Sequence, residues 1–373
     1  MREFDIAIIG GGIAGLSLAY FLGGSRSVVV LEREQGLGYH STGRSAAEFL
    51  LGYMPLEVTR MAAVAKEFFD APPAGFAVVP LLQRRGSLII ANAEKAENVR
   101  KAFETETARG GSPAMLTAEE AIDRAPILDP DYVAHAFYDP DFWDIEVDTL
   151  LQGYARGARH AGVEVRERAE VLSARYDGRR WVIVTTDGEI AARQVVNAAG
   201  AWADSIADIF GVEPQGIVPH RRTAILVDLP EGIDAAALPE VNEVDEEFYF
   251  KPDGGRLLVS PADETPSVPT DAQPEEIDVA WAAHYVEEAT TVEVRRVARS
   301  WAGLRSFSPD RLPVIGPAPD QPHFFWLAGQ GGFGILSSPA LGQLAASILL
   351  EKEPPEACLR HGLDRQHFRP GRF

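Results

Sequence analysis

The chain has very little cysteine: Cys358 is the single thiol among 373 residues. One thiol excludes an internal disulfide framework and any metal cluster built from cysteines, and it agrees with a reducing compartment. The eight histidines also lack the close spacing of a metal site. We therefore expect no metal ion in this protein.

Positive charge and long apolar runs are scarce as well. The chain has 35 Lys and Arg against 55 Asp and Glu, a net charge of -20, which repels phosphate backbones and argues against a nucleic-acid partner. No apolar run approaches the ~20 residues that span a bilayer, and the N-terminal apolar stretch shows no cleavage-site pattern. We expect a cytoplasmic protein without a transmembrane segment, a monomer or small homo-oligomer that acts on a small molecule.

What the sequence does contain is a glycine-rich turn near its start. Residues 4–9 predict a buried strand, and Gly10, Gly12 and Gly15 follow in GxGxxG spacing at the start of a helix that continues to residue 22. In such a turn the first glycine allows the tight bend, the second leaves room for a pyrophosphate, and the third lets the helix approach the strand.

A second strand, residues 28–31, follows this helix and ends on Glu32. An acidic residue about 20 positions after the glycines can accept hydrogen bonds from ribose hydroxyls. Strand, glycines, helix and acid together indicate a βαβ unit that binds a dinucleotide, and the alternative is a glycine-rich turn in another α/β domain. This motif alone does not separate FAD from NAD.

Two further segments suit close contact with a ligand. Residues 36–47 are rich in glycine, hydroxyl groups and small side chains, which favours the approach of a flat or charged ligand, although an ordinary helix-capping loop has a similar composition. Residues 327–335 form a second glycine-rich junction before an apolar helix that extends to residue 350. Nucleotide signatures at both ends of the chain indicate a discontinuous cofactor domain.

The length of the chain and its 46% hydrophobic content suggest two domains. We expect an α/β fold: a Rossmann-like cofactor domain from residues 1–50, 142–216 and 295–373, and an α+β substrate domain with an antiparallel sheet and helices from residues 51–141 and 217–294. Apolar periodicity predicts further helices at residues 58–70, 94–109, 149–160 and 275–289. It predicts further strands at residues 86–91, 133–138, 163–166, 171–175, 181–186, 194–197, 217–227 and 246–260.

These segments resemble the glycine oxidase and D-amino acid oxidase group of FAD enzymes, and most closely the bacterial FAD-dependent D-arginine dehydrogenases. The likeness runs nearly end to end. It rests on residues 10–15 with Glu32, and on residues 38–47, 196–202, 301–307 and 330–335. The Tyr-His-Ser-Thr-Gly-Arg run at residues 39–44 discriminates best, because the GxGxxG turn is shared with NAD enzymes.

The resemblance implies FAD as the cofactor, with Glu32 and Arg33 at the adenosine ribose and Val171 at the adenine. It also implies that the turn after Gly331 aims a helix N-terminus at the flavin N1 and C2 carbonyl, where the helix dipole stabilises the negative charge of the reduced ring. The implied cofactor-binding residues are Gly10, Gly12, Ile13, Ala14, Gly15, Glu32, Arg33, Ser41, Thr42, Arg44, Ser45, Ala46, Ala47, Val171, Ala199, Gly200, Trp202, Gly303, Gly331, Gly332, Phe333, Gly334 and Ile335.

On the substrate side, the resemblance implies that Arg222 and Arg305 bind a carboxylate and hold the substrate Cα–H over flavin N5. Tyr53, Tyr249 and the Gly332 backbone would complete the catalytic site. The alternative for each arginine is an ordinary surface ion pair, and the alternative for each tyrosine is a place in the hydrophobic core.

Four positions depart from the D-arginine enzymes, which carry a histidine at Glu48, a threonine at Leu50, an acid at Ser87 and a glutamine at Leu336. A desolvated guanidinium needs a carboxylate partner, so Ser87 argues against D-arginine. Leu50 and Leu336 predict an apolar pocket that accepts a range of neutral or hydrophobic D-amino acids. Glu48 suits either a substrate ammonium or basic side chain, or a solvated position at the edge of the cleft.

The resulting hypothesis is oxidative deamination of a D-amino acid to a 2-oxo acid and ammonia, with hydride transfer from Cα to flavin N5. One alternative is oxidation of a glycine- or sarcosine-type amine or of a 2-hydroxy acid. Another is a flavin-bound subunit without chemistry of its own. The preference for D substrates rests on the resemblance alone, and the electron acceptor, whether oxygen, a quinone or another carrier, is left open.

Overall fold

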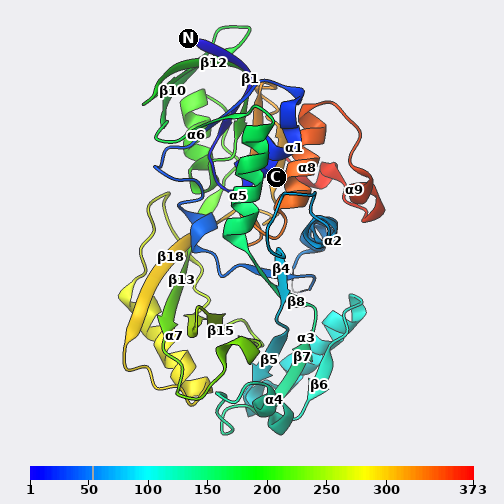
Figure 1. Ribbon diagram of the computed structural model, residues 1–373, viewed down its shortest axis with the longest axis vertical. Helices are drawn as coiled ribbons and strands as arrows, with labels where there is room; N and C mark the ends of the chain where they lie inside the picture. The colour runs from blue at the N-terminus through cyan, green and yellow to red at the C-terminus, as the bar shows by residue number, and fades with distance from the viewer. Residues whose placement is uncertain (53) are drawn as a thin grey trace.

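The computed structural model describes residues 1–52 and 54–373. Tyr53, which we expected in the substrate site, lies outside the described residues. Figure 1 shows two α/β halves that follow one another along the long axis, with both termini in the upper half. Among the described residues, no helix combines the length and the apolar character needed to cross a bilayer.

The upper half is built on a mixed eight-stranded sheet in the order β10-β11-β12-β1-β2-β9, with β20 beside β12 and β19 beside β20. The ladders between β1, β2, β9, β12 and β20 are parallel. The strands of this sheet are β1 (Arg2–Ile9), β2 (Val28–Leu31), β9 (Glu164–Arg166), β10 (Val171–Tyr176), β11 (Trp181–Thr185), β12 (Gly188–Asn197), β19 (Val314–Pro317) and β20 (Phe324–Ala328).

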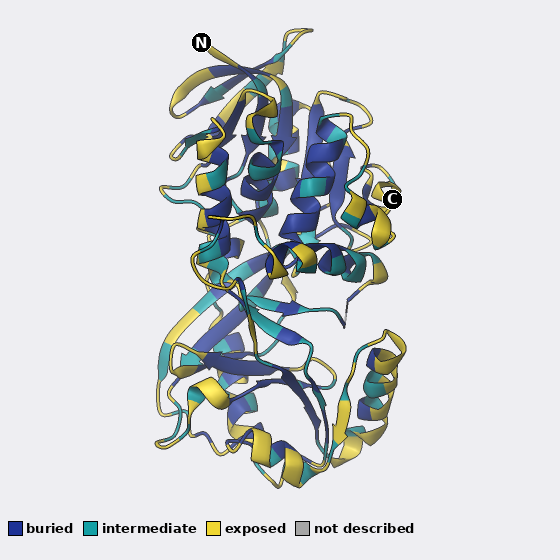
Figure 2. Cartoon of the chain, turned by 45° about the vertical axis from the view of Figure 1, so that its right-hand side comes forward, coloured by how far each residue is buried: buried dark blue, intermediate teal, exposed yellow. Residues whose placement is uncertain are grey.

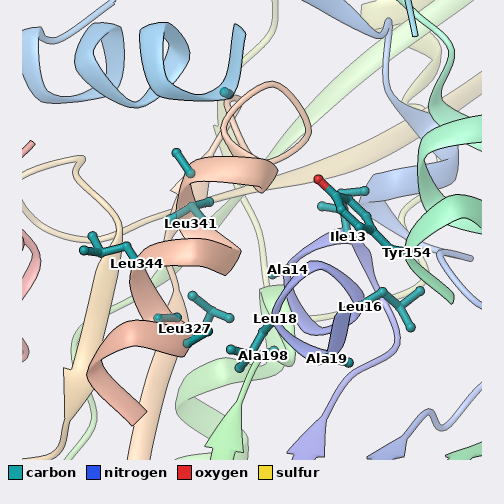
Figure 3. Packing of buried hydrophobic residues seen from close by; sticks show 14 of the residues in the cluster. Ile13, Ala14, Leu16, Leu18, Ala19, Tyr154, Ala198, Leu327, Leu341 and Leu344 are labelled. Atoms are coloured by element: carbon teal, nitrogen blue, oxygen red, sulfur yellow. The ribbon is translucent and has the colours of Figure 1, made fainter. Parts of the chain in front are cut away.

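Helices cover both faces of this sheet, so its central strands β1, β2 and β20 are largely apolar on both sides and buried, and Figure 2 shows buried strands in the middle of the upper half. On one face pack α1 (Ile13–Leu22), α2 (Leu56–Asp70), α5 (Val147–His160) and α8 (Ser338–Leu349), with the short α9 (Glu356–Arg360) beyond α2. The other face is covered by α6 (Ala203–Phe210). Figure 3 shows the seam of α1 and α8, where Leu16, Leu18, Leu341 and Leu344 share one apolar core.

The lower half is built on a ten-stranded, largely antiparallel sheet in the order β21-β18-β13-β16-β15-β14-β5-β7-β6, with β17 beside β13. Its strands are β5 (Ser87–Ala91), β6 (Ala114–Leu116), β7 (His135–Asp139), β13 (Val218–Val227), β14 (Glu240–Glu243), β15 (Tyr249–Asp253), β16 (Arg256–Ser260), β17 (Thr265–Pro266), β18 (Val297–Phe307) and β21 (Gln330–Gly331). The helices of this half are α3 (Ala96–Ala108), α4 (Ala118–Arg124) and α7 (Glu276–Ala289).

The two faces of the second sheet differ in chemistry because alternate residues of a strand point to opposite sides. Ile225, Phe250 and Val259 lie on one face, where they form an apolar core with Ala282 and Val286 of α7. The opposite face carries polar residues of β18, β13 and β15 and looks toward the upper half. This second face is therefore available for a ligand.

A small antiparallel sheet joins the halves, with β8 (Phe142–Ile145) between β3 (Glu48–Leu50) and β4 (Leu82–Arg84). Two elements lie on the other side of the domain boundaries that the sequence suggested. The strand β18, expected in the cofactor domain, pairs with β13 along most of its length, and α2, expected in the substrate domain, buries Met61 and Phe69 in the core of the upper half. Both shifts follow from long-range pairing, and the exact domain boundaries stay a prediction.

The structure confirms the mixed α/β fold class, a Rossmann-like domain combined with a second, largely antiparallel domain. Most predicted elements are present within two residues of their expected ends, as for α7 and β13. The helix expected at residues 94–109 begins instead at Ala96, after a short 3₁₀ turn. The C-terminal helix begins at Ser338 and not directly at the glycines.

Candidate active site

A long cavity runs from the carboxyl ends of the first sheet to the polar face of the second. Its lining includes Ile9 and Leu31, which end β1 and β2, and it reaches Arg222, Tyr249 and Arg305 on the second sheet. The cavity encloses about 1720 Å³ of empty space, its open mouth included. One continuous cavity therefore joins the glycine turn of the first sheet to the polar face of the second.

Most of the residues predicted to bind the cofactor line this cavity. Three of them stand behind the lining: Gly15 packs against the Gly10 carbonyl, Phe333 lies against the core of the upper half, and Ala47 begins the path into β3. The predicted residues in the lining are Gly10, Gly12, Ile13, Ala14, Glu32, Arg33, Ser41, Thr42, Arg44, Ser45, Ala46, Val171, Ala199, Gly200, Trp202, Gly303, Gly331, Gly332, Gly334 and Ile335.

The first glycine turn has the geometry of an anion site. Gly10 has a φ of +110°, and a Cβ added there would lie 2.4 Å from the Ala198 carbonyl oxygen. A Cβ on Gly15 would lie 2.0 Å from the Gly10 oxygen, so only glycine lets α1 approach β1 this closely. The first turn of α1 opens into the cavity at Gly12 and Ala14, and its free N–H groups attract a negatively charged group such as a phosphate.

Glu32 holds this turn in place from the neighbouring strand. Its Oε2 accepts a hydrogen bond of 2.7 Å from the Gly11 N–H, and its Oε1 accepts one of 2.8 Å from the Glu34 N–H. Each carboxylate oxygen has a second lone pair, which remains for a ribose hydroxyl. Nearby, the Arg33 guanidinium stacks 4.5 Å above the Trp202 ring, which makes a flat wall at this end of the cavity.

The loop at residues 38–47 is fastened to β18 of the second sheet. The Ser41 hydroxyl donates to the Leu304 carbonyl at 2.7 Å, and Trp301 Nε1 donates to the Arg44 carbonyl at 3.1 Å. The Arg44 guanidinium donates to the carbonyls of Ala302 and Ala272 and pairs with Asp271. We expected Arg44 to face the cofactor directly. Its guanidinium instead makes most of its contacts with the protein, and these contacts hold the loop against β18.

The sequence left open that this loop only caps a helix, and one of its side chains, Thr42, does so. Thr42 Oγ1 accepts a hydrogen bond of 3.1 Å from the Ile13 N–H and so caps the first turn of α1. Because Thr42 and Ser45 also line the cavity, capping and ligand contact are compatible. The loop therefore couples the first helix, the second sheet and the cavity wall.

The C-terminal glycine turn lines the cavity, but the helix after it does not begin there. Gly331, Gly332 and Gly334 lie in the lining, while turns occupy the residues before α8 begins at Ser338. We expected the helix N-terminus itself to face the flavin. The structure instead presents the backbone of the turn, because Ser337 and Ser338 are buried and α8 packs on α1.

The strand register brings Arg222 and Arg305 together although 82 positions of sequence separate them. Arg222 on β13 is opposite Gly303 on β18, and Arg305 is opposite His220, so both arginines project from the same face of this antiparallel pair. The Arg305 side chain crosses Gly332, where an added Cβ would lie 3.2 Å from its Cζ atom. Both guanidinium groups reach the cavity.

Arg222 has no direct ion-pair partner among the described residues, although Asp263 and Glu264 are near enough to favour its charged form. Its Nε atom is buried without a hydrogen-bond partner among the described residues, and their ion pairs include no carboxylate bound to Arg222 or Arg305. Burial lowers the pKa of the Arg222 guanidinium below its usual range, and the neighbouring Arg305 lowers it further. Such a pair is stabilised by an anion placed between the two guanidinium groups, and a substrate carboxylate has the matching geometry.

Tyr249 lies on β15 and faces the same cavity. Burial raises the pKa of its hydroxyl, with a further increase from Glu48. Tyr249 therefore stays neutral at physiological pH, when it can donate a hydrogen bond to an anion beside the arginines. The alternative of an ordinary core tyrosine is only half correct, because the ring is buried while the residue also forms part of the cavity wall.

The four positions that depart from the D-arginine enzymes lie in different parts of the structure. Leu336 is buried in the core around α1 and α8, and Leu50 packs against that core. Ser87 lies on β5, where its hydroxyl accepts a hydrogen bond of 3.0 Å from Asn242 Nδ2. Glu48 lies on β3 with its Oε1 atom buried, so the expectation of a solvated cleft edge does not describe that oxygen.

The arrangement fits FAD. A glycine turn with free N–H groups, an acid at the ribose position and a glycine-rich loop at the far end follow one another along a single cavity. Near the far end, Ser306 Oγ and Gln330 Nε2 are buried without hydrogen-bond partners among the described residues. A polar ring system placed there would satisfy both atoms.

Comparison with known proteins decides between the possible dinucleotides. The sequence from residue 5 to residue 348 matches the family described as FAD dependent oxidoreductase. The chain belongs to that family.

Two curated relatives and two solved structures illustrate the range of this flavoprotein family. Glycine oxidase from Geobacillus kaustophilus is 28% identical over 94% of both chains, and its crystal structure superposes with a TM-score of 0.78 over 98% of this chain and 99% of that one. Mitochondrial dimethylglycine dehydrogenase from Rattus norvegicus is 25% identical over 94% of this chain but only 43% of its own length. L-alpha-glycerophosphate oxidase from Mycoplasma pneumoniae, solved with FAD bound, shares the fold at 19% identity, with a TM-score of 0.82 over 95% of this chain and 97% of that one.

Sequence reasoning missed the polar residues behind the substrate side of this FAD-dependent oxidoreductase. Lys251 is buried, and its Nζ donates to the Ala46 carbonyl at 2.6 Å and to Asp144 Oδ1 at 2.7 Å. Glu240 is also buried, and its Oε1 accepts a hydrogen bond from Asn242. A lysine two positions after Tyr249, on the same strand face, was the signal available in the sequence.

Proposed function

We propose that this FAD-dependent oxidoreductase oxidises the α-amine of a D-amino acid and releases a 2-oxo acid and ammonia. The observation that carries the proposal is the converging pair Arg222 and Arg305, two half-buried cations that share one face of the second sheet and have no carboxylate at ion-pair distance among the described residues. A flavin-bound scaffold without chemistry has no need for such a pair. The resemblance to D-arginine dehydrogenases supports the D configuration.

In this proposal the chain's own residues bind and orient the substrate. Arg222 and Arg305 bind the carboxylate, and Tyr249 donates a further hydrogen bond, which fixes the position of Cα relative to the flavin end of the cavity. Bound FAD supplies the acceptor for the two electrons that leave Cα as a hydride. The amine lone pair then forms the C=N bond, the nitrogen loses a proton, and water converts the imine to the 2-oxo acid and ammonia.

The substrate amine must be neutral for its lone pair to assist this step. We therefore expect the rate of flavin reduction to rise with pH through the ionisation of the bound amine and then to level off. A rate that is independent of pH between about 6 and 10 would contradict a requirement for the neutral amine.

The decisive experiment is anaerobic mixing of the FAD-loaded enzyme with a panel of D-amino acids while the absorbance of the oxidised flavin is recorded. Loss of this absorbance with at least one D-amino acid supports the proposal, and no loss with any of them would refute it. The matching L-amino acids in the same panel test the configuration, since reduction by L enantiomers alone would reverse that assignment. Reoxidation by oxygen compared with a quinone then identifies the electron acceptor.

Oxidation of a glycine- or sarcosine-type amine is the second candidate. The similarity to glycine oxidase and dimethylglycine dehydrogenase favours it, and the same pair of arginines would bind the carboxylate of those small substrates. Glycine, sarcosine and dimethylglycine therefore belong in the panel. Flavin reduction by these three compounds, with none by D-amino acids that carry a side chain, would select this candidate.

The expected preference for neutral or hydrophobic side chains rested on Leu50, Leu336 and Ser87. In the structure the two leucines pack with the core of the upper half, and Ser87 lies beside Asn242 and Glu240. The panel must therefore contain apolar, polar and charged side chains of similar length. The preference itself stays a prediction.

A further inference from the structure

A buried lysine connects the second sheet to the loop at residues 38–47. Lys251 lies on β15 two positions after Tyr249, so both side chains leave the same face of the strand. Lys251 is only 5% exposed, and its Nζ donates to the Ala46 carbonyl at 2.6 Å and to Asp144 Oδ1 at 2.7 Å. Because Ala46 and Tyr249 both line the cavity, this ammonium joins two parts of the cavity wall.

The peptide next to this bond has an unusual conformation. Ala47 has a φ of +63°, in the left-handed region that residues other than glycine rarely adopt. Its N–H donates to Ser45 Oγ at 3.0 Å, and its carbonyl accepts a hydrogen bond of 2.7 Å from the Ile145 N–H. With Lys251 on the preceding carbonyl, three consecutive polar groups of the turn are fixed. Strained backbone persists only where its surroundings hold it, and it is concentrated at functional sites.

This turn decides where the loop leaves the cavity. Ser45 and Ala46 are in the lining, and at Glu48 the chain has entered β3, which pairs with β8 in the small sheet. Ala46 also packs against the apolar cluster that contains Ala224 and Tyr249. A movement of Ala46 therefore changes the gap between the loop and the face of the second sheet that carries the substrate residues.

The surroundings of Lys251 keep its ammonium charged. Burial acts to lower the pKa of Lys251, but Glu48, Glu240 and Asp144 act in the opposite direction and raise it above its usual range. Asp144 is itself held by an ion pair with Arg85. Hydrogen bonds from a charged donor are stronger than those between neutral groups, so these acids strengthen the bond from the ammonium to the loop.

Stability alone does not account for this arrangement, because well-packed apolar side chains can often replace a buried ion pair without loss. We propose that Lys251 is a positioning residue, which sets the separation between the cofactor loop at Ala46 and the substrate-binding face at Tyr249. The inference rests on the proposed function where a substrate carboxylate lies on Arg222 and Arg305. The anchoring of the loop does not depend on which substrate is oxidised.

Positioning affects the rate of reaction more than the affinity for the substrate. Reacting atoms must approach to about 3–3.5 Å, and a displacement of about 1 Å can reduce a rate about a hundredfold. The two arginines bind the carboxylate wherever the loop lies. A loop released from Lys251 should therefore slow hydride transfer and leave substrate binding nearly intact.

Flavin reduction separates these two effects in the Lys251→Met variant, which loses the bond to Ala46 and keeps both arginines. The compound that reduces the wild-type flavin fastest in the amino-acid panel is mixed anaerobically with each enzyme at several concentrations. We expect the limiting rate constant to fall at least about tenfold and the substrate dissociation constant to change less than about threefold. An unchanged limiting rate constant would overturn the proposal.

A second measurement needs no turnover. The dissociation constant of FAD, followed by the fluorescence of released flavin, should rise at least about threefold in Lys251→Met, because the loop has lost a charged hydrogen bond. An unchanged constant would show that Lys251 does not hold the loop. If no amino acid reduces the wild-type flavin, the proposed function fails, and this measurement alone decides whether Lys251 anchors the loop.

Lys95→Met is the matched control. Lys95 is also largely buried, but its ion pairs are with three acids at residues 243–247. It should lower the thermal midpoint and leave the limiting rate constant and the FAD dissociation constant unchanged. Equal losses in both lysine variants would mean that missing ion pairs explain the effects. If Lys251→Met does not fold, the double variant Lys251→Met/Asp144→Asn removes a cation and an anion together and should show the same two effects.

Discussion

Arg221 and Arg222 are neighbours on β13 but have opposite electrostatic surroundings. Arg221 lies 3.0 Å from Asp278 Oδ2 and also pairs with Glu275 beside α7. Arg222 faces the cavity together with Arg305 and lacks a carboxylate partner among the described residues. The ion pair that the sequence left open as an alternative for Arg222 is thus found at its neighbour Arg221 and not at Arg222 among the described residues.

This contrast gives a paired test of the carboxylate site. Arg305→Met should raise the dissociation constant of the substrate at least about a hundredfold, because it removes a charge-assisted interaction and leaves the substrate anion poorly compensated. Stopped-flow flavin reduction at several substrate concentrations measures the constant. Arg221→Met should leave it unchanged and lower the thermal midpoint instead, since α7 loses its ion pairs. An unchanged constant in Arg305→Met would mean that the carboxylate binds elsewhere.

The position of the Arg305 side chain depends on Gly332. Because an added Cβ would lie 3.2 Å from the Arg305 Cζ and Nη1 atoms, Gly332→Ala should displace the guanidinium and weaken substrate binding by about three- to tenfold, an overpacking cost near 1 kcal/mol. FAD content should stay normal. Gly36→Ala is the control, since a Cβ there meets no atom within 4 Å. Equal behaviour of the two variants would show that Arg305 adjusts freely.

Arg44 should contribute to FAD binding through the position of its loop. Arg44→Met removes donors to the Ala302 and Ala272 carbonyls, and we expect the FAD dissociation constant to rise at least about tenfold, consistent with the loss of one or more charged hydrogen bonds. Fluorescence of released flavin measures this constant. Arg100→Met, which removes exposed ion pairs on α3, should not change it. Normal FAD affinity in Arg44→Met would show that the loop is held by its other contacts.

The buried acid Glu240 should make stability depend on pH. Its pKa is raised in the folded protein, so the folded state holds a proton that the unfolded state releases, and the free energy of unfolding falls as pH rises from about 4.5 toward the folded pKa. Glu240→Gln lacks this titration. Its stability relative to wild type should therefore increase with pH above about 4.5, as measured by urea unfolding.

The control for this measurement is Glu243→Gln, a change at a buried acid on the same strand that pairs with Lys95. It should be less stable than wild type at neutral pH, because the ion pair with Lys95 is lost. A stability difference for Glu240→Gln that does not change between pH 4.5 and pH 8 would contradict a raised pKa at this position.

The cofactor end of the cavity was predictable because its signals are local. Gly10, Gly15 and Glu32 lie within one βαβ unit, where spacing in the sequence maps directly onto spacing in the structure. The start of the C-terminal helix was less accessible: glycines in the turn allow several backbone paths, and packing of α8 on α1 decides that the helix begins at Ser338.

The substrate end depends on contacts between distant segments. Lys251 meets Asp144 from a position more than a hundred residues away, and only the register of β13 with β18 shows which of two adjacent arginines faces the cavity. At Leu336 the sequence suggested a residue of the substrate pocket, whereas the side chain packs in the core of the upper half. Patterns along one chain do not contain these pairings.

The hydrogen bonds between the loop at residues 38–47 and β18 affect which residues of this strand can change during evolution. Ser41 and Arg44 donate to main-chain carbonyls of β18, and carbonyl groups are present whatever side chains the strand carries. Substitutions at the cavity-facing positions of β18 can therefore accumulate without releasing the cofactor loop. Related enzymes can thus differ in substrate through the side chains of this strand while the cofactor keeps its position.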